Sequence, residues 1–437
     1  MKNTNTTLQI IKSKLISFWS FFHFPIIVGV CMIFLLALVG IWNGNYNKTN
    51  EQVTKTGNYI QWKIENIKNI STFFDNAGLI RDSGHYSFIA KNGGYTVYDD
   101  PKYLDLFAFF PLYPAQIRLT HEITQLNYSS SALLSGFINT LLFCSVLYLF
   151  LSQYTKDTSK LNTTFLIAIL LPFNFFFFVS YTESLFSLLV LSIIYITIKI
   201  YESTSFKNWF WFLPILCLMV SLTRSPGVMV SAFLSCVLLE INYNSNWKVF
   251  IHKVKQNFHK NILILISILA NIVGIFSFLL YGFVQTGNFW ISRDIQANWG
   301  RGETKNIFEP IFDFIANPVL KCLAEICSLS DNTHNIYRGI ALLISVCCII
   351  LAVKYFNNQI LFKSILVLSV LFCILPLTTN TLLSYNRLSN VSPLYLVFLP
   401  IFIYNLIPKD YHKIFMIFMC MFYFIGISYY YKVEFIG

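Results

Sequence analysis

Charged residues are scarce in this chain of 437 residues. Asp, Glu, Lys and Arg together make up 12 % of it, about half of the ~25 % that soluble globular proteins carry. Apolar residues make up 56 %, and the mean hydropathy is +0.60. These values exclude a soluble enzyme and a disordered chain, and they indicate a polytopic membrane protein.

The signatures of several common sites are also missing. Of the ten cysteines only Cys322 and Cys327 lie outside predicted helices, so there is no disulfide framework or zinc site, although a single bond between these two stays open. The chain has no Asp-x-Asp pattern of nucleotide-sugar enzymes and no dinucleotide fingerprint. His85, His121 and Asp82 share one loop but have no metal-ligand spacing. We therefore predict no metal and no cofactor.

Long apolar stretches predict eleven transmembrane helices. They cover residues 18–42, 131–152, 162–179, 183–200, 208–223, 226–243, 261–283, 337–354, 362–379, 392–407 and 412–431. Two connections are long, at residues 43–130 and 284–336. The first apolar run is too long for a cleaved signal peptide and is expected to be an anchor. We predict a single all-α integral membrane domain, residues 1–437, whose first outer loop carries short amphipathic helices.

The placement of the charges predicts the orientation. With the N-terminus in the cytoplasm, fifteen of the 31 basic and four of the 20 acidic residues fall on the cytoplasmic side, so the whole net charge of +11 lies there. This bias is the usual topology signal of membrane proteins. It argues against nucleic acid as a partner. We expect a multi-pass protein of a bacterial cell membrane, or of the endoplasmic reticulum if the source is eukaryotic.

Arginine and lysine are distributed unequally between the two sides. All fifteen basic residues predicted on the cytoplasmic side are lysines, and all seven arginines are predicted outside. The arginines are Arg81, Arg118, Arg224, Arg293, Arg301, Arg338 and Arg387. A guanidinium binds phosphate or carboxylate through a planar fork. The arginines therefore either handle an anionic ligand on the outer face or pair with the carboxylates there.

The first outer loop contains the pattern Arg-Asp-Ser-Gly-His-Tyr at residues 81–86. Asp82 lies among glycines and aromatic residues, and a carboxylate in a partly apolar cleft suits a general base. In a second interpretation, Asp82 or Ser83 caps a short helix that runs to Ala90. His85 is either a proton shuttle or an interfacial ring. Both interpretations of Asp82 stay open at this point.

Glu183 is the carboxylate at the outer start of a predicted membrane helix, within Tyr-Thr-Glu-Ser-Leu-Phe at 181–186. A carboxylate costs ~2–3 kcal/mol at the centre of a membrane helix and less near its end. Such residues usually face the bundle interior or an aqueous cavity. The alternative is a structural ion pair, for which Arg224, in a turn on the same face, is the obvious partner.

Two further groups lie on this face. Gln296, Trp299 and Arg301 bring an amide, an aromatic ring and a guanidinium close together, a combination that suits a sugar phosphate but is a weak signal alone. Arg387 follows Tyr385 shortly before the tenth predicted helix. It either clamps a phosphate at headgroup depth or anchors the end of that helix.

Taken in order, these patterns resemble the PIG-V mannosyltransferases of GPI-anchor assembly and their bacterial relatives, which are GT-C glycosyltransferases. The resemblance runs through most of the chain. It rests on Asp82-Ser83-Gly84-x-Tyr86 with Gly94-Tyr95, on residues 109–114 and 181–186, on Thr223-Arg224-Ser225-x-Gly227, on Gln296-x-x-Trp299-Gly300-Arg301, and on Arg387 before Pro393. The residue pattern of the first loop is more similar to that of the bacterial members of the family.

The resemblance implies a GT-C-like fold and an inverting transfer of a sugar, with mannose expected, from a polyprenyl-phosphate donor. The acceptor would be a lipid-linked or cell-surface glycan or a glycolipid on the extracytoplasmic side. Asp82 matches the position of the general base. The residues expected to bind substrate are His85, Tyr86, Glu183, Arg224, Gln296, Trp299, Arg301 and Arg387.

Departures from the family pattern leave the sugar and the acceptor open. Arg81 stands where the family usually has Trp, and Pro226 where Asn is common. A lipid-linked oligosaccharide flippase or transporter and a polysaccharide polymerase are alternative functions. The long first loop, the odd helix number and the lack of an internal repeat argue against a transporter, and the Asp82 block argues for the transferase over the polymerase.

Overall fold

The computed structural model describes residues 2–43, 67–95, 101–171, 174–243, 246–296, 332–378 and 385–431. These residues form helices, turns and short irregular segments, and none of them lies in a β-strand. The expected all-α class is therefore confirmed for this part of the chain.

Each of the eleven predicted apolar stretches contains a helix. The longer helices are α1 (Lys2–Asn43), α6 (Tyr128–Leu151), α8 (Glu183–Glu202), α10 (Met229–Asn242), α12 (Phe258–Thr286), α15 (Asn332–Phe356) and α19 (His412–Tyr431). The shorter ones are α7 (Thr158–Leu170), α9 (Phe212–Ser221), α16 (Phe362–Ile374) and α18 (Leu399–Leu406). The boundaries expected from the sequence were accurate to a few residues for most of them.

Six helical segments of the described chain are long and apolar enough to cross a membrane: Trp19–Asn43, Tyr128–Leu151, Glu183–Glu202, Ser225–Asn242, Phe258–Thr286 and Lys409–Ser428. They support an integral membrane protein, but the count of eleven crossings is not confirmed. Breaks shorten other stretches. A π-helical segment, η8 (Leu394–Phe398), precedes α18, and the 3-10 turn η4 (Asn208–Trp211) precedes α9.

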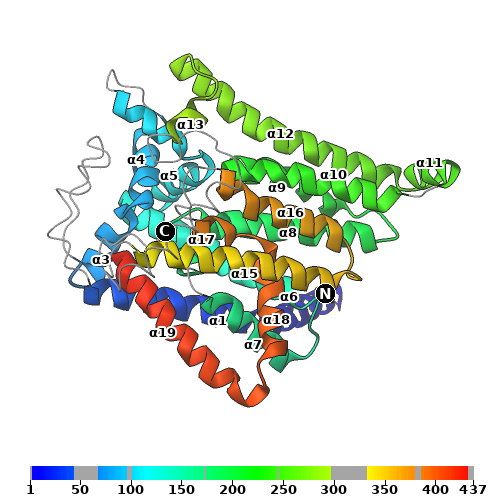
Figure 1. Cartoon of the computed structure of the whole chain (residues 1–437), viewed down its shortest axis with the longest axis horizontal. Coiled ribbons are helices and arrows are strands. Elements are labelled where there is room, and N and C mark those ends of the chain that lie inside the picture. The colour runs from blue at the N-terminus through cyan, green and yellow to red at the C-terminus, as the bar shows by residue number, and fades with distance from the viewer. Residues whose placement is uncertain are drawn as a thin grey trace.

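The long helices run roughly side by side, and α19 crosses them obliquely (Figure 1). Four short helices gather at one end of this bundle: α3 (Ile70–Asn76), α4 (Asp82–Asn92), α5 (Leu112–Thr124) and α13 (Ile291–Asp294). The opposite end carries α11 (Trp247–Gln256). We call these two ends the α4 end and the α11 end. The helices of the predicted first outer loop thus cover one end of the bundle.

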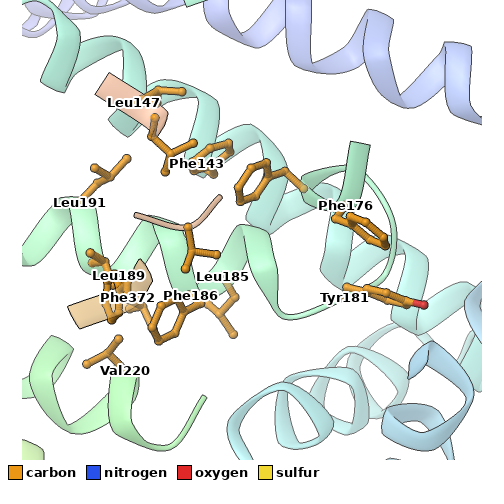
Figure 2. Close-up of a cluster of buried hydrophobic side chains, with 14 of the residues drawn as sticks. Phe143, Leu147, Phe176, Tyr181, Leu185, Phe186, Leu189, Leu191, Val220 and Phe372 are labelled. Carbon is orange, nitrogen blue, oxygen red and sulfur yellow. The ribbon is translucent and has the colours of Figure 1, made fainter. Parts of the chain in front are cut away.

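Helix α8 forms the centre of the bundle. Inside the protein, 72 % of its apolar segment is buried, compared with 33 % for α12 and 22 % for Lys409–Ser428. Figure 2 shows its side chains packed against those of α6, α9 and α16, with these residues labelled: Leu185, Phe186, Leu189, Leu191, Phe143, Leu147, Val220 and Phe372. Because α8 begins at Glu183, its central position carries that carboxylate into the interior.

A close backbone contact holds α4 against the start of α6. Gly78, in the 3-10 turn η1 (Ala77–Leu79), donates its N–H to Ser129 Oγ at 3.0 Å. A Cβ at this position would lie 2.2 Å from the Ser129 carbonyl oxygen, so only glycine fits. Ser87 Oγ of α4 donates to the Gly78 carbonyl at 3.0 Å. These contacts fix the helix that begins with Asp82.

Candidate active site

Four charged side chains from distant parts of the chain form one connected group at the α4 end. Arg387 Nη1 donates to Asp82 Oδ2 at 2.5 Å, and Arg387 Nε donates to Glu183 Oε1. Arg224 Nη1 donates to the same Glu183 oxygen at 2.8 Å. We call these four residues the charged cluster. The pairing of Glu183 with Arg224, one of the two alternatives for this carboxylate, is present, and Arg387 extends it to Asp82.

The two carboxylates of the charged cluster differ in access. The Glu183 side chain is 1 % exposed and the Asp82 side chain is 26 % exposed. A buried charge is tolerated only when it is paired and hydrogen-bonded, and Glu183 has two guanidinium partners. Glu183 is thus a counter-ion inside the protein, whereas Asp82 is the carboxylate that a ligand can reach.

The backbone before Asp82 is unusual. Arg81 has φ 54° and ψ −131°, and Ser83 N donates to the Ile80 carbonyl at 3.2 Å. This geometry is that of a type II′ turn with Arg81 at the position where glycine is normal. Holding a non-glycine residue in such a region costs ~1–3 kcal/mol, and such strain clusters at functional sites.

The capping interpretation of Asp82 and Ser83 is wrong. The residue that flanks the start of α4 is Arg81, and no side chain caps this helix. The carboxylate of Asp82 lies against Arg387 instead. Ser83 Oγ donates to the Ser180 carbonyl at 2.8 Å, which ties α4 to the turn before α8. The helix itself was predicted, but its first carboxylate is used for an ion pair.

Aromatic rings support Arg387. Its Cζ lies 4.4 Å from the ring centroid of Tyr181 and 5.5 Å from that of Phe176. These two rings stack at 5.8 Å, and the Tyr181 hydroxyl points away from the apolar core (Figure 2). A guanidinium over an aromatic face is attracted by the ring quadrupole. The platform therefore holds Arg387 in place with few additional polar partners.

Helix α17 (Tyr385–Ser389) delivers Arg387 and is itself fixed by hydrogen bonds. The Tyr385 hydroxyl lies 2.9 Å from Ser345 Oγ of α15, and Ser345 also bonds with the hydroxyl of Tyr395. Tyr385, which the sequence places beside Arg387, is therefore an anchor of α17. Arg387 does more than anchor a helix end, because its guanidinium joins two carboxylates.

His85 and Tyr86 lie beside the charged cluster. The His85 ring stacks on Phe109 at 4.6 Å. Burial lowers the pKa of His85 to about 4, although the nearby Asp82 acts in the opposite direction. The Tyr86 hydroxyl lies 3.2 Å from Thr182 Oγ1, and burial raises its pKa to about 12. Both side chains are therefore uncharged at neutral pH.

The other predicted site residues fall in less informative places. Gln296 lies two residues beyond α13, which packs against α12. Trp299 and Arg301 lie outside the described residues, as do Cys322 and Cys327. Arg118 pairs with Glu122 at 2.9 Å on the surface of α5, so pairing with an outer carboxylate explains this arginine.

One contact had no signal in the sequence. The ring of Tyr430 in α19 lies under the guanidinium of Arg81, 5.7 Å from Arg81 Cζ, and 5.8 Å from the ring of Tyr181. Nothing marks Tyr430 among the 25 tyrosines of the chain. Only the packing of α19 reveals it.

No known protein family and no curated protein matches this sequence. Among solved structures, the chain is similar to the oligosaccharyltransferase of Archaeoglobus fulgidus in complex with zinc and sulfate, at 11 % identity and a TM-score of 0.45 over 93 % of this chain and 53 % of that one. For the apo form of that enzyme, the identity is 10 % and the TM-score is 0.46, over 92 % of this chain and 56 % of that one. The third structure is the archaeal oligosaccharyltransferase AglB of the same organism in complex with an inhibitory peptide and a dolichol-phosphate. Its identity is 10 % and its TM-score is 0.45, over 93 % of this chain and 56 % of that one.

This chain thus spans about half the length of these archaeal structures. TM-scores below 0.5 at such low identity do not establish a shared fold. The function proposed below therefore depends on the geometry of the charged cluster and on the motifs in the sequence.

Proposed function

We propose that this protein is an inverting glycosyltransferase that moves a sugar from a polyprenyl-phosphate donor to a glycan or glycolipid acceptor. One observation carries the proposal. An accessible carboxylate, Asp82, is joined through Arg387 to a buried ion pair of Glu183 and Arg224. A base and cations for a phosphate leaving group thus lie together at one end of an apolar helical bundle.

Asp82 is the general base in this reaction. It accepts the proton of an acceptor hydroxyl while that oxygen forms a bond to the anomeric carbon of the sugar. The 26 % exposure of Asp82 leaves room for such a hydroxyl, and the 1 % exposure of Glu183 does not. Arg387 stabilises the negative charge of Asp82, so the base is present in its ionised form before the acceptor arrives.

The leaving group is a lipid monophosphate. As the bond between the anomeric carbon and the phosphate oxygen breaks, the electron pair moves onto that oxygen, and the new charge needs preorganised cations. Arg387 is suited to this task because its guanidinium is held on a ring platform and lies against the accessible Asp82. Its bond to Glu183 fixes the side chain before the donor binds.

The remaining assignments follow from the motifs. The resemblance to PIG-V-like enzymes supports a mannosyl donor and an extracytoplasmic site, with the cytoplasm at the lysine-rich α11 end. Trp299, Arg301 and Gln296 are proposed to contact the sugar or its phosphate. The prenyl chain would lie among the apolar helices that surround the cluster.

The proposal is tested with purified protein, radiolabelled polyprenyl-phosphate mannose and a lipid extract that supplies acceptors, with and without EDTA. We expect release of polyprenyl phosphate that matches the label found in an acceptor, and the same rate in EDTA. Transbilayer movement of the donor without cleavage would instead identify a flippase. Elongation of lipid-linked chains without use of the monosaccharide donor would identify a polymerase.

A further inference from the structure

Arg81 is a further cation beside the charged cluster, since it directly precedes Asp82 in the chain and its guanidinium lies over the ring of Tyr430. The following inference rests on the function proposed above. We propose that Arg81 and Arg387 together bind the phosphate group of the lipid donor, whereas Arg224 is a structural counter-ion of Glu183. In the sequence Arg81 is one of the seven outer arginines and a departure from a family pattern, and the structure places it on a ring that neighbours the one under Arg387.

Two neighbouring rings carry the two guanidinium groups. Arg81 Cζ lies 5.7 Å from the ring centroid of Tyr430, and Arg387 Cζ lies 4.4 Å from that of Tyr181. The two rings meet edge to face, with centroids 5.8 Å apart and an interplanar angle of 75°. Tyr430 comes from α19 and Tyr181 from the turn before α8, so packing of these elements places two cations on one aromatic shelf.

Electrostatics supports this placement. The pKa of the Tyr181 hydroxyl is raised by its burial, and both Arg387 and Arg81 act in the opposite direction. Both guanidinium groups are therefore close enough to influence a single hydroxyl. A phosphate offers several acceptor oxygens to two planar forks.

The backbone conformation of Arg81 indicates that its side chain has a functional role. Its φ of 54° places it where a type II′ turn normally has glycine. A strained residue next to a proposed base points to a functional side chain. Arg224 differs from Arg81 because its extended backbone carries no such strain. It differs from Arg387 because, among the described ion pairs, it contacts only the buried Glu183, whereas Arg387 also reaches the accessible Asp82.

We call the pair of Arg81 and Arg387 the phosphate clamp. It is tested without any sugar transfer, by measuring how polyprenyl phosphate and the matching polyprenol bind to the purified protein. Loss of one charged hydrogen-bonding group from a phosphate site lowers affinity by about ten- to a hundredfold. We expect this loss in Arg81→Gln for the phosphate and no change for the alcohol. Arg81→Gly, which suits the positive φ, should behave the same way, and Arg81→Lys should be intermediate. Arg118→Gln, at the same end of the bundle, is the matched control and should bind like wild type.

The unmodified protein provides a second readout. Phenylglyoxal modifies accessible arginines, and mass spectrometry reports the rate at each position. Polyprenyl phosphate should protect Arg81 but leave Arg118 reactive, and polyprenol should protect neither of them. The clamp is rejected if Arg81 stays as reactive with the phosphate as without it, or if Arg81→Gln keeps wild-type affinity while Arg387→Gln loses it. A wild-type protein that binds the phosphate through Arg81 but transfers no sugar would keep the clamp and reject the proposed transfer.

Discussion

The two ends of the helical bundle hold their cations in different ways. At the α4 end, the side chains of Arg387 and Arg224 are 9 % and 13 % exposed and are bonded to two carboxylates. At the α11 end, Lys199 pairs with Glu202 at 2.8 Å, but these side chains are 28 % and 36 % exposed. Helix α11 carries further lysines and has no buried residue. Both ends carry basic side chains, yet among the described ion pairs only those of the charged cluster hold their cations largely buried.

This difference separates a topological role from a chemical one. Exposed ion pairs contribute ~0–1 kcal/mol, and lysines facing lipid headgroups need no fixed partner. Burying Glu183 and the two arginines costs desolvation energy that pairing only partly offsets. Ion pairing for stability alone is therefore a weak reason for the charged cluster, which agrees with the function proposed above. The predictions below compare a residue at the α4 end with a matched residue at the α11 end.

The largest effect is expected from Asp82→Asn. Removal of a general base slows the reaction by ~10²–10⁴-fold, so turnover with polyprenyl-phosphate sugar should nearly vanish while the protein stays folded and monodisperse. Asp157→Asn is the matched control, because Asp157 only caps α7 through a bond from Lys160 N at 3.0 Å, and Asn caps as well as Asp. Wild-type turnover in Asp82→Asn would remove Asp82 as the base.

Glu183→Gln should destabilise the protein strongly. Breaking a buried pair leaves uncompensated charge and costs ~3–5 kcal/mol, here because Arg224 and Arg387 lose their shared partner. Glu202→Gln at the α11 end should cost at most ~1 kcal/mol. Unfolding in detergent, followed by circular dichroism, measures both. Equal costs would show that burial does not distinguish the two ends.

Arg387→Lys tests whether the fork of the guanidinium is needed. A lysine ammonium keeps the charge but cannot bond Asp82 and Glu183 in the same geometry. Misplacement of a catalytic group by ~1 Å can cost on the order of 100-fold, so we expect turnover to fall by that order. The reverse exchange at the α11 end, Lys199→Arg, should leave turnover unchanged. If Arg387→Lys also leaves turnover unchanged, a positive charge at this position is sufficient and the geometry of the guanidinium is not required.

The last prediction concerns the dependence of stability on pH. The pKa of His85 is lowered to about 4 by burial, whereas an unfolded histidine has a pKa of ~6.5. The unfolded chain therefore binds more protons between these values, so stability should fall as the pH drops from ~6.5 to 4 and level off below. His85→Phe keeps the stack on Phe109 and should flatten this slope. His252→Gln, exposed on α11, should retain the wild-type profile.

The helices and the pairing at α8 were predictable from the sequence. Apolar runs marked one helix in each of the eleven predicted stretches. A carboxylate at the start of a membrane helix needed a partner at the same depth, for which Arg224 was the obvious candidate. The distribution of arginine and lysine also indicated at which end of the bundle arginines would meet carboxylates. These features depend on local composition and on the order of segments along the chain.

Other features depend on tertiary packing and left no local signal. The sequence placed Arg387 beside Tyr385, but α17 directs it to Asp82, which is 305 positions away. The positive φ of Arg81 depends on how α4 joins η1. Because this position is not a glycine, nothing in the sequence indicated the turn. The shelf of Tyr181 and Tyr430 forms only when α19 packs across the bundle.

An experimental structure of the protein with polyprenyl phosphate tests the central claim most directly. The account predicts phosphate density at the α4 end, within hydrogen-bond distance of the Arg387 guanidinium and beside the carboxylate of Asp82. A phosphate bound at the α11 end among the lysines, with the charged cluster left unchanged, would contradict it.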